Sequence, residues 1–77
     1  MERRKSAEKV FGGEVAGLRK RLGISQEELG FRTGLHRTYV SQIERGIKSP
    51  TFGVILKFAS ALEVSAAKLV ATVERKL

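Results

Sequence analysis

Apolar residues recur every three or four positions along most of the chain, a spacing that predicts helices. An early run predicts a helix that Gly23 ends, with apolar positions at Phe11, Val15, Leu18 and Leu22. A late run predicts a helix capped by Ser65, with apolar positions at Ala66, Leu69, Val70, Val73 and Leu77. The sequence has no strand pattern, internal repeat or low-complexity segment. The expected fold class is therefore all-α.

Polar capping residues divide the middle of the chain into shorter helices. Ser25 and Glu28 form a capping box, in which the serine hydroxyl accepts the N–H of Glu28 and the glutamate reaches back to the N–H of Ser25. This box predicts a helix from about Gln26 to just before Gly34. The next helix is expected over about 37–45, with His36 in the N-cap position.

The fourth expected helix covers roughly 52–62, and Thr51 can cap it. Its apolar residues cover more than one face, so we expect burial on two sides. In the first helix, Gly12, Gly13 and Gly17 each cost roughly 0.5–1 kcal/mol relative to alanine. We expect close packing against a neighbouring helix to offset part of that cost.

Composition narrows the class of protein. The 77 residues allow one domain, residues 1–77, and we expect residues 1–7 to be a flexible basic N-terminus. A formal charge of +7 favours a polyanionic partner. The absence of cysteine excludes disulfides and cysteine-ligated zinc, and suits a reducing cytoplasm. No apolar run approaches the ~18 residues of a membrane span, so neither a membrane nor a signal peptide is expected.

The twenty positions from Gln26 satisfy the steric rules of a helix-turn-helix. The fifth, Gly30, is small where two helices cross, and the ninth, Gly34, tolerates the positive φ of the turn. The tenth, fifteenth and eighteenth positions point into the core and are apolar: Leu35, Val40 and Ile43. The fourth position, Leu29, also complies with the motif. On a basic chain, such a motif indicates a protein that reads base edges in duplex DNA.

Three segments carry a resemblance to a known family. They are Leu-Arg-Lys-Arg-Leu-Gly-Ile-Ser-Gln-Glu-Glu-Leu, then Thr-Gly-Leu-His-Arg-Thr-Tyr-Val-Ser-Gln-Ile-Glu-Arg-Gly, then Ser-Pro-Thr. Together they resemble the Cro/lambda-repressor-type (XRE) helix-turn-helix family over about residues 10–70. The resemblance implies a compact five-helix lambda-repressor-like domain. The segment Leu-His-Arg-Thr-Tyr-Val-Ser also resembles the recognition helix of the controller proteins of restriction-modification systems.

The resemblance implies roles for individual residues. Base edges are expected to be contacted by Arg37, Thr38, Ser41 and Gln42. The DNA backbone is expected to be contacted by Gln26, His36, Tyr39, Arg45 and Lys48. Arg37 is the best candidate for a bidentate grip on guanine. The alternatives are that Gln42 bonds locally, that Tyr39 packs half-buried beside Phe31, and that the basic side chains are simply solvated.

The resemblance also implies structural roles. Arg19 should pair with Glu44 and tie the first helix to the third, so Glu44 is not expected to contact DNA. Glu63 stands where the family often has glycine, and Gly30 stands where alanine is usual. The first departure predicts that the turn after the fourth helix differs from the family's.

These observations favour a sequence-specific transcription regulator that binds a palindromic operator as a homodimer and controls a restriction-modification system or another locus. The dimer is expected to use Phe58, Val70, Val73 and Leu77, although each residue could instead pack in its own monomer. The alternative is an antitoxin-like or other interaction module that binds DNA only within a complex. With one histidine, no cysteine and no spaced carboxylate pair, an enzyme is not expected. Neither a metal, a cofactor nor a small-molecule ligand is expected.

Overall fold

The computed structural model describes residues 6–77, and they form five helices with no strand among them. The helices are α1 (Ala7–Leu22), α2 (Gln26–Thr33), α3 (Arg37–Glu44), α4 (Phe52–Ala61) and α5 (Ala66–Arg75). The all-α prediction is confirmed. The expected flexible N-terminus falls mainly on residues 1–5, outside the described residues. Ser6 and Ala7 already form the cap and the first residue of α1.

Side-chain caps fix where the helices begin. The expected caps Ser25, Thr51 and Ser65 accept the backbone N–H groups of Glu28, Val54 and Lys68 at 3.0, 3.2 and 2.9 Å. The prediction that Glu28 reaches back to the Ser25 N–H is wrong. The Glu28 carboxylate accepts from Arg32 Nε at 3.1 Å instead. An arginine one turn along the helix offers the carboxylate a charged donor, which a backbone N–H does not match.

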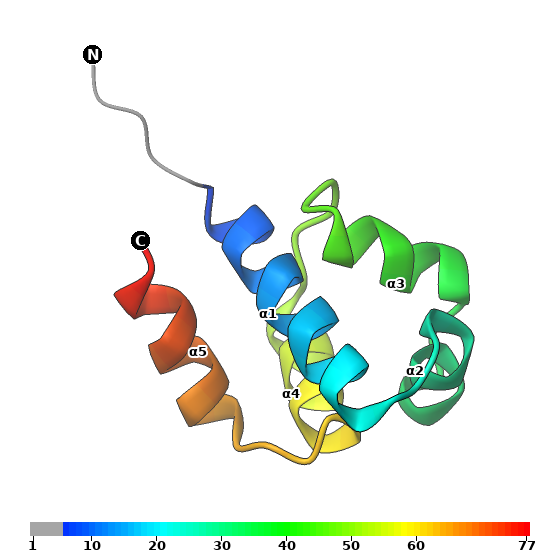
Figure 1. The fold of residues 1–77 in the computed structure, drawn as a ribbon. Helices are drawn as coiled ribbons and strands as arrows, with labels where there is room; N and C mark the ends of the chain where they lie inside the picture. The colour runs from blue at the N-terminus through cyan, green and yellow to red at the C-terminus, as the bar shows by residue number, and fades with distance from the viewer. Residues whose placement is uncertain (1–5) are drawn as a thin grey trace.

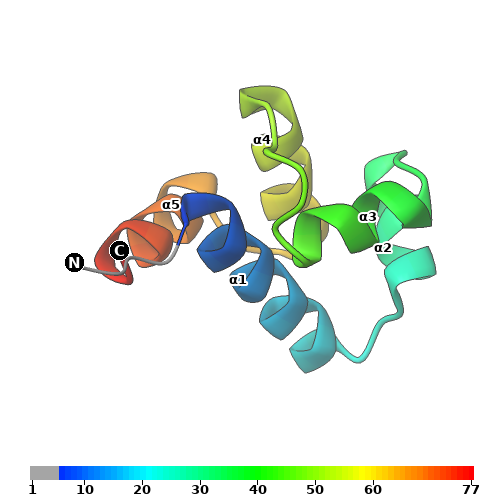
Figure 2. The ribbon, with the colours of Figure 1, turned by 90° about the horizontal axis from the view of Figure 1, so that it is seen from above.

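Helix α1 lies between α3 on one side and α5 on the other in both views (Figures 1 and 2). The core fills the space where the helices meet: Val10, Phe11, Val15, Leu29, Val40, Ile43, Phe58, Ala59, Leu62, Leu69 and Val73. Phe58 is fully buried at its centre, and its ring meets the edge of Phe11 with centroids 6.2 Å apart. None of the helices among residues 6–77 combines the length and the apolarity that a bilayer span requires.

Burial corrects part of the expected dimer surface. Phe58 is 0% exposed and Val73 is 8% exposed, so both pack within their own monomer and offer a partner almost nothing. Val70 and Leu77 remain 45% and 54% exposed. The reason is the helical period, which turns Val73 toward α1 while its neighbours on α5 face solvent.

Helix α4 is not buried on two sides within the monomer, contrary to expectation. Only Phe58 and Ala59 are buried on this helix. Phe52 is 76% exposed and Leu56 is 44% exposed, so a second apolar side of α4 faces solvent. The sequence pattern was two-sided, but the single chain supplies a partner for one side only.

The three glycines of α1 are not equivalent. A Cβ built at Gly12 would overlap the backbone carbonyl oxygens of Ile43 and Glu44, which confirms close packing against α3 at this residue. A Cβ at Gly13 or Gly17 would meet nothing within 4 Å, so the same expectation is wrong for these two. Glu63 adopts a φ of 64°, the left-handed conformation that glycine would favour. A glutamate therefore occupies a glycine-like turn.

Candidate nucleic-acid interface

The turn between α2 and α3 brings the two helices into backbone contact. A Cβ at Gly30 would lie 2.5 Å from the carbonyl oxygen of Leu35, and the Leu35 N–H donates to the Gly30 carbonyl at 2.9 Å. Gly34, between them, has a φ of 74°. Both steric expectations for the helix-turn-helix are therefore confirmed: a small fifth residue and a left-handed ninth.

Helix α3 has an apolar inner face and a polar outer face. Val40 and Ile43 are both 0% exposed and anchor the helix to the core. Arg37 and Thr38 are exposed, while Ser41 and Gln42 are half-buried. The four residues predicted to read bases thus lie on one helix, and their contact with DNA stays a prediction.

Arg37 stands at the start of α3 with its side chain 65% exposed. Its Nη1 lies 3.9 Å from Glu27 Oε2 on α2, and the glutamate side chain is 78% exposed. Such an exposed and loose pair contributes at most about 1 kcal/mol. The guanidinium is therefore held near the surface of α2 but can move away at little cost.

Arg45 folds back along α3. Its Nε donates to Ser41 Oγ at 3.2 Å and to the Ser41 carbonyl at 3.4 Å. The sequence predicts both residues at the interface but gives no sign that they contact each other. Lys48 is exposed in the loop that follows, where its N–H donates to the Gln42 carbonyl at 3.4 Å. Both cations lie just beyond the end of α3.

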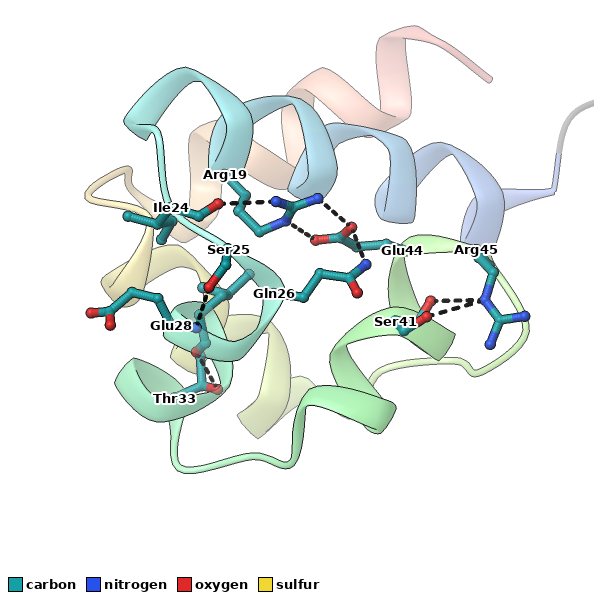
Figure 3. A network of polar contacts seen from close by, with 10 residues as sticks. Arg19, Ile24, Ser25, Gln26, Glu28, Thr33, Ser41, Glu44 and Arg45 are labelled. Atoms are coloured by element: carbon teal, nitrogen blue, oxygen red, sulfur yellow. Dashed lines mark hydrogen bonds and ion pairs between the residues drawn. The ribbon is translucent and has the colours of Figure 1, made fainter.

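Three helices meet at one carboxylate, Glu44 (Figure 3). Arg19 of α1 donates from Nε to Glu44 Oε2 at 2.6 Å and from Nη2 to Oε1 at 3.0 Å. Gln26, the first residue of α2, donates from Nε2 to Glu44 Oε1 at 2.9 Å. The hydrogen bonds that Arg19 donates to the Glu44 carboxylate raise the pKa of Arg19 above its ordinary value. The predicted pairing of Arg19 with Glu44 is confirmed.

Glu44 is also the only acidic residue within α3. Its side chain is 6% exposed and that of Arg19 is 12% exposed, so the pair is nearly buried. Gln26 is half-buried and braces the end of α3 through the same carboxylate. The outer face of α3 is consequently left without a negative charge of its own.

His36 and Tyr39 lie in different environments. His36 is exposed and caps α3, with Nδ1 accepting the Thr38 N–H at 3.0 Å. Tyr39 is half-buried and packs against the core, which agrees with the half-burial in one of its alternatives, while the packing beside Phe31 stays a prediction. Phe31 is 85% exposed on α2, although it is aromatic.

Several exposed apolar residues were missed from the sequence. Phe31, Phe52 and Leu56 stand out because each is large and at least 44% exposed. For α4 the sequence did contain a signal of exposed apolar residues, because its apolar residues are too many to lie on one face of the helix. The signal for Phe31 was its setting, because the other residues of α2, apart from Leu29 and Gly30, are polar.

Comparison with known proteins places this geometry in a family. The family model described as helix-turn-helix matches residues 15–69. The HTH-type transcriptional regulator y4dJ of Sinorhizobium fredii is 40% identical over 62 residues, which is 80% of each chain. The control protein C.BamHI of Bacillus amyloliquefaciens is 43% identical over 56 residues, covering 71% of this chain and 69% of that one.

Solved structures agree with these relatives. The restriction-modification controller protein C.AhdI from Aeromonas hydrophila superimposes with a TM-score of 0.77 at 41% identity, covering 79% of this chain and 92% of that chain. The DNA-binding domain of the P22 C2 repressor superimposes with the same TM-score at 30% identity, covering 82% and 83%. The chain therefore belongs to the helix-turn-helix family of the Cro/lambda-repressor (XRE) type.

Proposed function

We propose that this protein is a sequence-specific transcription regulator that binds a palindromic operator in duplex DNA as a homodimer. The observation that carries the proposal is the outer face of α3, which presents Arg37, Thr38, Ser41 and Gln42 while Val40 and Ile43 anchor its inner face. The regulators and controllers among its relatives support the same function. The C.BamHI and C.AhdI matches favour the controller of a restriction-modification system, acting in the cytoplasm.

The chemistry of the side chains on α3 and just beyond it supports different contacts with bases and with phosphates. A guanidinium can donate two hydrogen bonds to guanine O6 and N7 in the major groove, and Arg37 is the exposed arginine at the start of the helix. Arg45 and Lys48 lie beyond its end, where cations meet phosphates and position the protein without reading sequence. Gln26, His36 and Tyr39 complete the proposed backbone contacts. Because Glu44 is buried and paired, α3 presents no carboxylate to repel phosphate.

Exposed apolar surface supports the homodimer. Val70 and Leu77 on α5 are 45% and 54% exposed, and Phe52 and Leu56 on α4 are 76% and 44% exposed. A short chain hides little of its surface alone, so covering these side chains with a second copy would stabilise it. Helix α5 lies on the opposite side of α1 from α3, so a contact there leaves α3 uncovered (Figure 1). Two α3 helices would then enter successive major grooves roughly 34 Å apart.

Selection from a random duplex library at several salt concentrations tests DNA recognition. We expect a two-fold symmetric site and a slope of several units in log K against log salt. On that site, Arg37→Ala should cost ~1–3 kcal/mol and relax discrimination at one base pair. Arg21→Ala is the matched control, because it removes the same charge from a groove that α1 shares with α5. Equal loss on every sequence would reassign Arg37 to phosphate.

Sedimentation equilibrium tests the dimer. The wild type should be dimeric at micromolar concentration, and either Val70→Asp with Leu77→Asp, or Phe52→Ser with Leu56→Ser, should shift it to monomer. The four side chains are exposed in the monomer, so their replacement opens no cavity and should leave the fold intact. The pair whose replacement gives a monomer therefore assigns the dimer contact to α5 or to α4. A wild type that is monomeric both alone and on DNA would contradict the proposed homodimer.

The second candidate is an antitoxin-like module that binds DNA only with another protein. Phe31, exposed at 85% beside α3, is the observation that favours it. Uniform weak binding to every duplex in the selection experiment would support this candidate over the regulator.

A further inference from the structure

The N-cap of α3 differs chemically from the other four. Ser6, Ser25, Thr51 and Ser65 cap the other helices through hydroxyl oxygens, whereas His36 caps α3 through its imidazole Nδ1. The Thr38 N–H donates to this nitrogen at 3.0 Å, and His36 has the extended backbone of an N-cap, with φ −70° and ψ 145°. Serine, threonine, aspartate and asparagine are the strong caps, so capping alone does not explain a histidine here.

The capping bond fixes where the proton of the ring lies. A backbone N–H can only donate, so Nδ1 must carry a lone pair, and the neutral ring then holds its proton on Nε2. Nε2 lies across the ring from Nδ1, and the residue is exposed. The first turn of α3 thus carries an N–H donor that extends farther from the backbone than the O–H of a hydroxyl cap and that a carboxylate cap lacks. Its position is held by the same contact that starts the helix.

The surroundings of His36 suit an anion. Glu27, Phe31, Leu35 and Arg37 line the same surface hollow as His36. Arg37 is a cation, and the N-terminus of α3 carries the positive end of the helix dipole. The one carboxylate of the hollow, Glu27, lies 3.9 Å from Arg37 Nη1, so these two charges offset each other and the helix terminus supplies the remaining attraction for an anion.

We propose that His36 is held in a single neutral tautomer, in which Nδ1 caps the recognition helix and the Nε2–H donates a hydrogen bond to a DNA phosphate oxygen. The proposal rests on the proposed function and deepens it, because it assigns one side chain to both the register of α3 and its grip on the backbone. A neutral donor releases no counterion. His36 therefore adds affinity without adding to the salt dependence, unlike the cation Lys48.

Two substitutions separate the two roles. His36→Asn retains a strong cap, but its amide N–H donor ends short of the Nε2 position, whereas His36→Ala loses both the cap and the donor. We expect the asparagine variant to unfold at the wild-type urea concentration or above it, and the alanine variant to unfold at a lower one. On the selected operator at pH 8, both should lose affinity, roughly two- to tenfold for asparagine and more for alanine. The salt slope should stay at the wild-type value for both, whereas Lys48→Ala should lower it by about 1.

Nitrogen-15 NMR reads the tautomer directly, because the chain contains one histidine. The spectrum at pH 8 should show a protonated Nε2 and an unprotonated Nδ1 in the free protein, and Nε2–H exchange with water should slow on the operator. An Nδ1–H tautomer, an asparagine variant that binds as tightly as the wild type, or a lowered salt slope in that variant would overturn the inference. A wild type that selects no site would instead overturn the proposed function. The spectrum of the free protein would still show whether Nδ1 of His36 is unprotonated, as the cap requires.

Discussion

Gly12→Ala should destabilise the protein, although it removes a glycine from the interior of a helix. Alanine gains roughly 0.5–1 kcal/mol over glycine through helix propensity. Against this gain, the new Cβ would overlap the Ile43 carbonyl oxygen and would lie 2.6 Å from the Glu44 carbonyl oxygen, where ordinary contact begins at 3.4 Å. Both neighbours are backbone atoms at the end of α3, so no change of rotamer relieves the overlap.

The cost follows from the movement that the overlap requires. Helix α1 would have to withdraw from α3 by at least about 0.8 Å, the shortfall between 2.6 and 3.4 Å at the Glu44 oxygen, and by more at the Ile43 oxygen, which the Cβ would approach more closely. That movement loosens the packing of buried residues such as Val15 in the core and lengthens the bonds from Arg19 to Glu44. Overpacking of this kind costs typically ~1–3 kcal/mol, so about 0–2.5 kcal/mol remains after the propensity gain. Because the overlapped atoms belong to the backbone and cannot rotate away, we expect a net loss in the upper part of that range, about 1–2.5 kcal/mol. For a domain of this size each kcal/mol lowers the Tm by roughly 4–8 °C.

Two neighbouring glycines provide matched controls. Gly13→Ala and Gly17→Ala should each stabilise the protein by about 0.5–1 kcal/mol, because a Cβ at either residue meets nothing within 4 Å. Urea unfolding followed by circular dichroism, at one protein concentration for all variants, measures the three changes. If Gly12→Ala raised stability as the controls do, α1 and α3 would not be in backbone contact, and the reasoning from this geometry would be refuted.

Two further substitutions test contacts away from Gly12. Glu44→Ala should cost about 3 kcal/mol, because it leaves Arg19 nearly buried without its carboxylate and removes the acceptor of Gln26; a change in unfolding free energy below about 1 kcal/mol would argue against the buried pair. Glu63→Gly should stabilise by about 1 kcal/mol by relieving a φ of 64°. Glu63→Ala removes the same carboxylate, 3.7 Å from Arg32, but keeps the strain, so equal stabilities of these two variants would contradict the prediction.

Local rules explain why the helix-turn-helix could be predicted closely. The Ser25 hydroxyl accepts the N–H of the residue three positions later in the chain, and Gly34 ends α2 in a left-handed conformation. Both effects act within one turn of helix, so the sequence alone contains the information. The pairing of Arg19 with Glu44 joins residues 25 positions apart and was inferred from a family resemblance, not from a local rule.

The packing of the helices against one another explains what the sequence could not determine. Gly12, Gly13 and Gly17 look alike in the sequence, and only the crossing of α1 with α3 makes Gly12 different. Likewise, Phe52 and Phe58 are both large apolar residues of α4, yet one is 76% exposed and the other 0%. Periodicity reveals that α4 has two apolar sides but not which side the monomer covers. For the same reason the sequence leaves open whether Phe58 lies on the dimer surface or in the core.

The buried carboxylate of Glu44 has two effects: it keeps a negative charge away from the outer face of α3, and it braces the end of that helix. An acid on the outer face of α3 would face phosphates, whereas here it is 6% exposed and its charge is matched by Arg19. If Glu44 acted mainly by repelling DNA, Glu44→Ala would tighten binding once enough protein is folded. We expect the opposite, a weaker complex, because Gln26 and the end of α3 lose their shared acceptor and the recognition helix loses its bracing. Operator affinity measured at a temperature where both proteins are fully folded decides between the two.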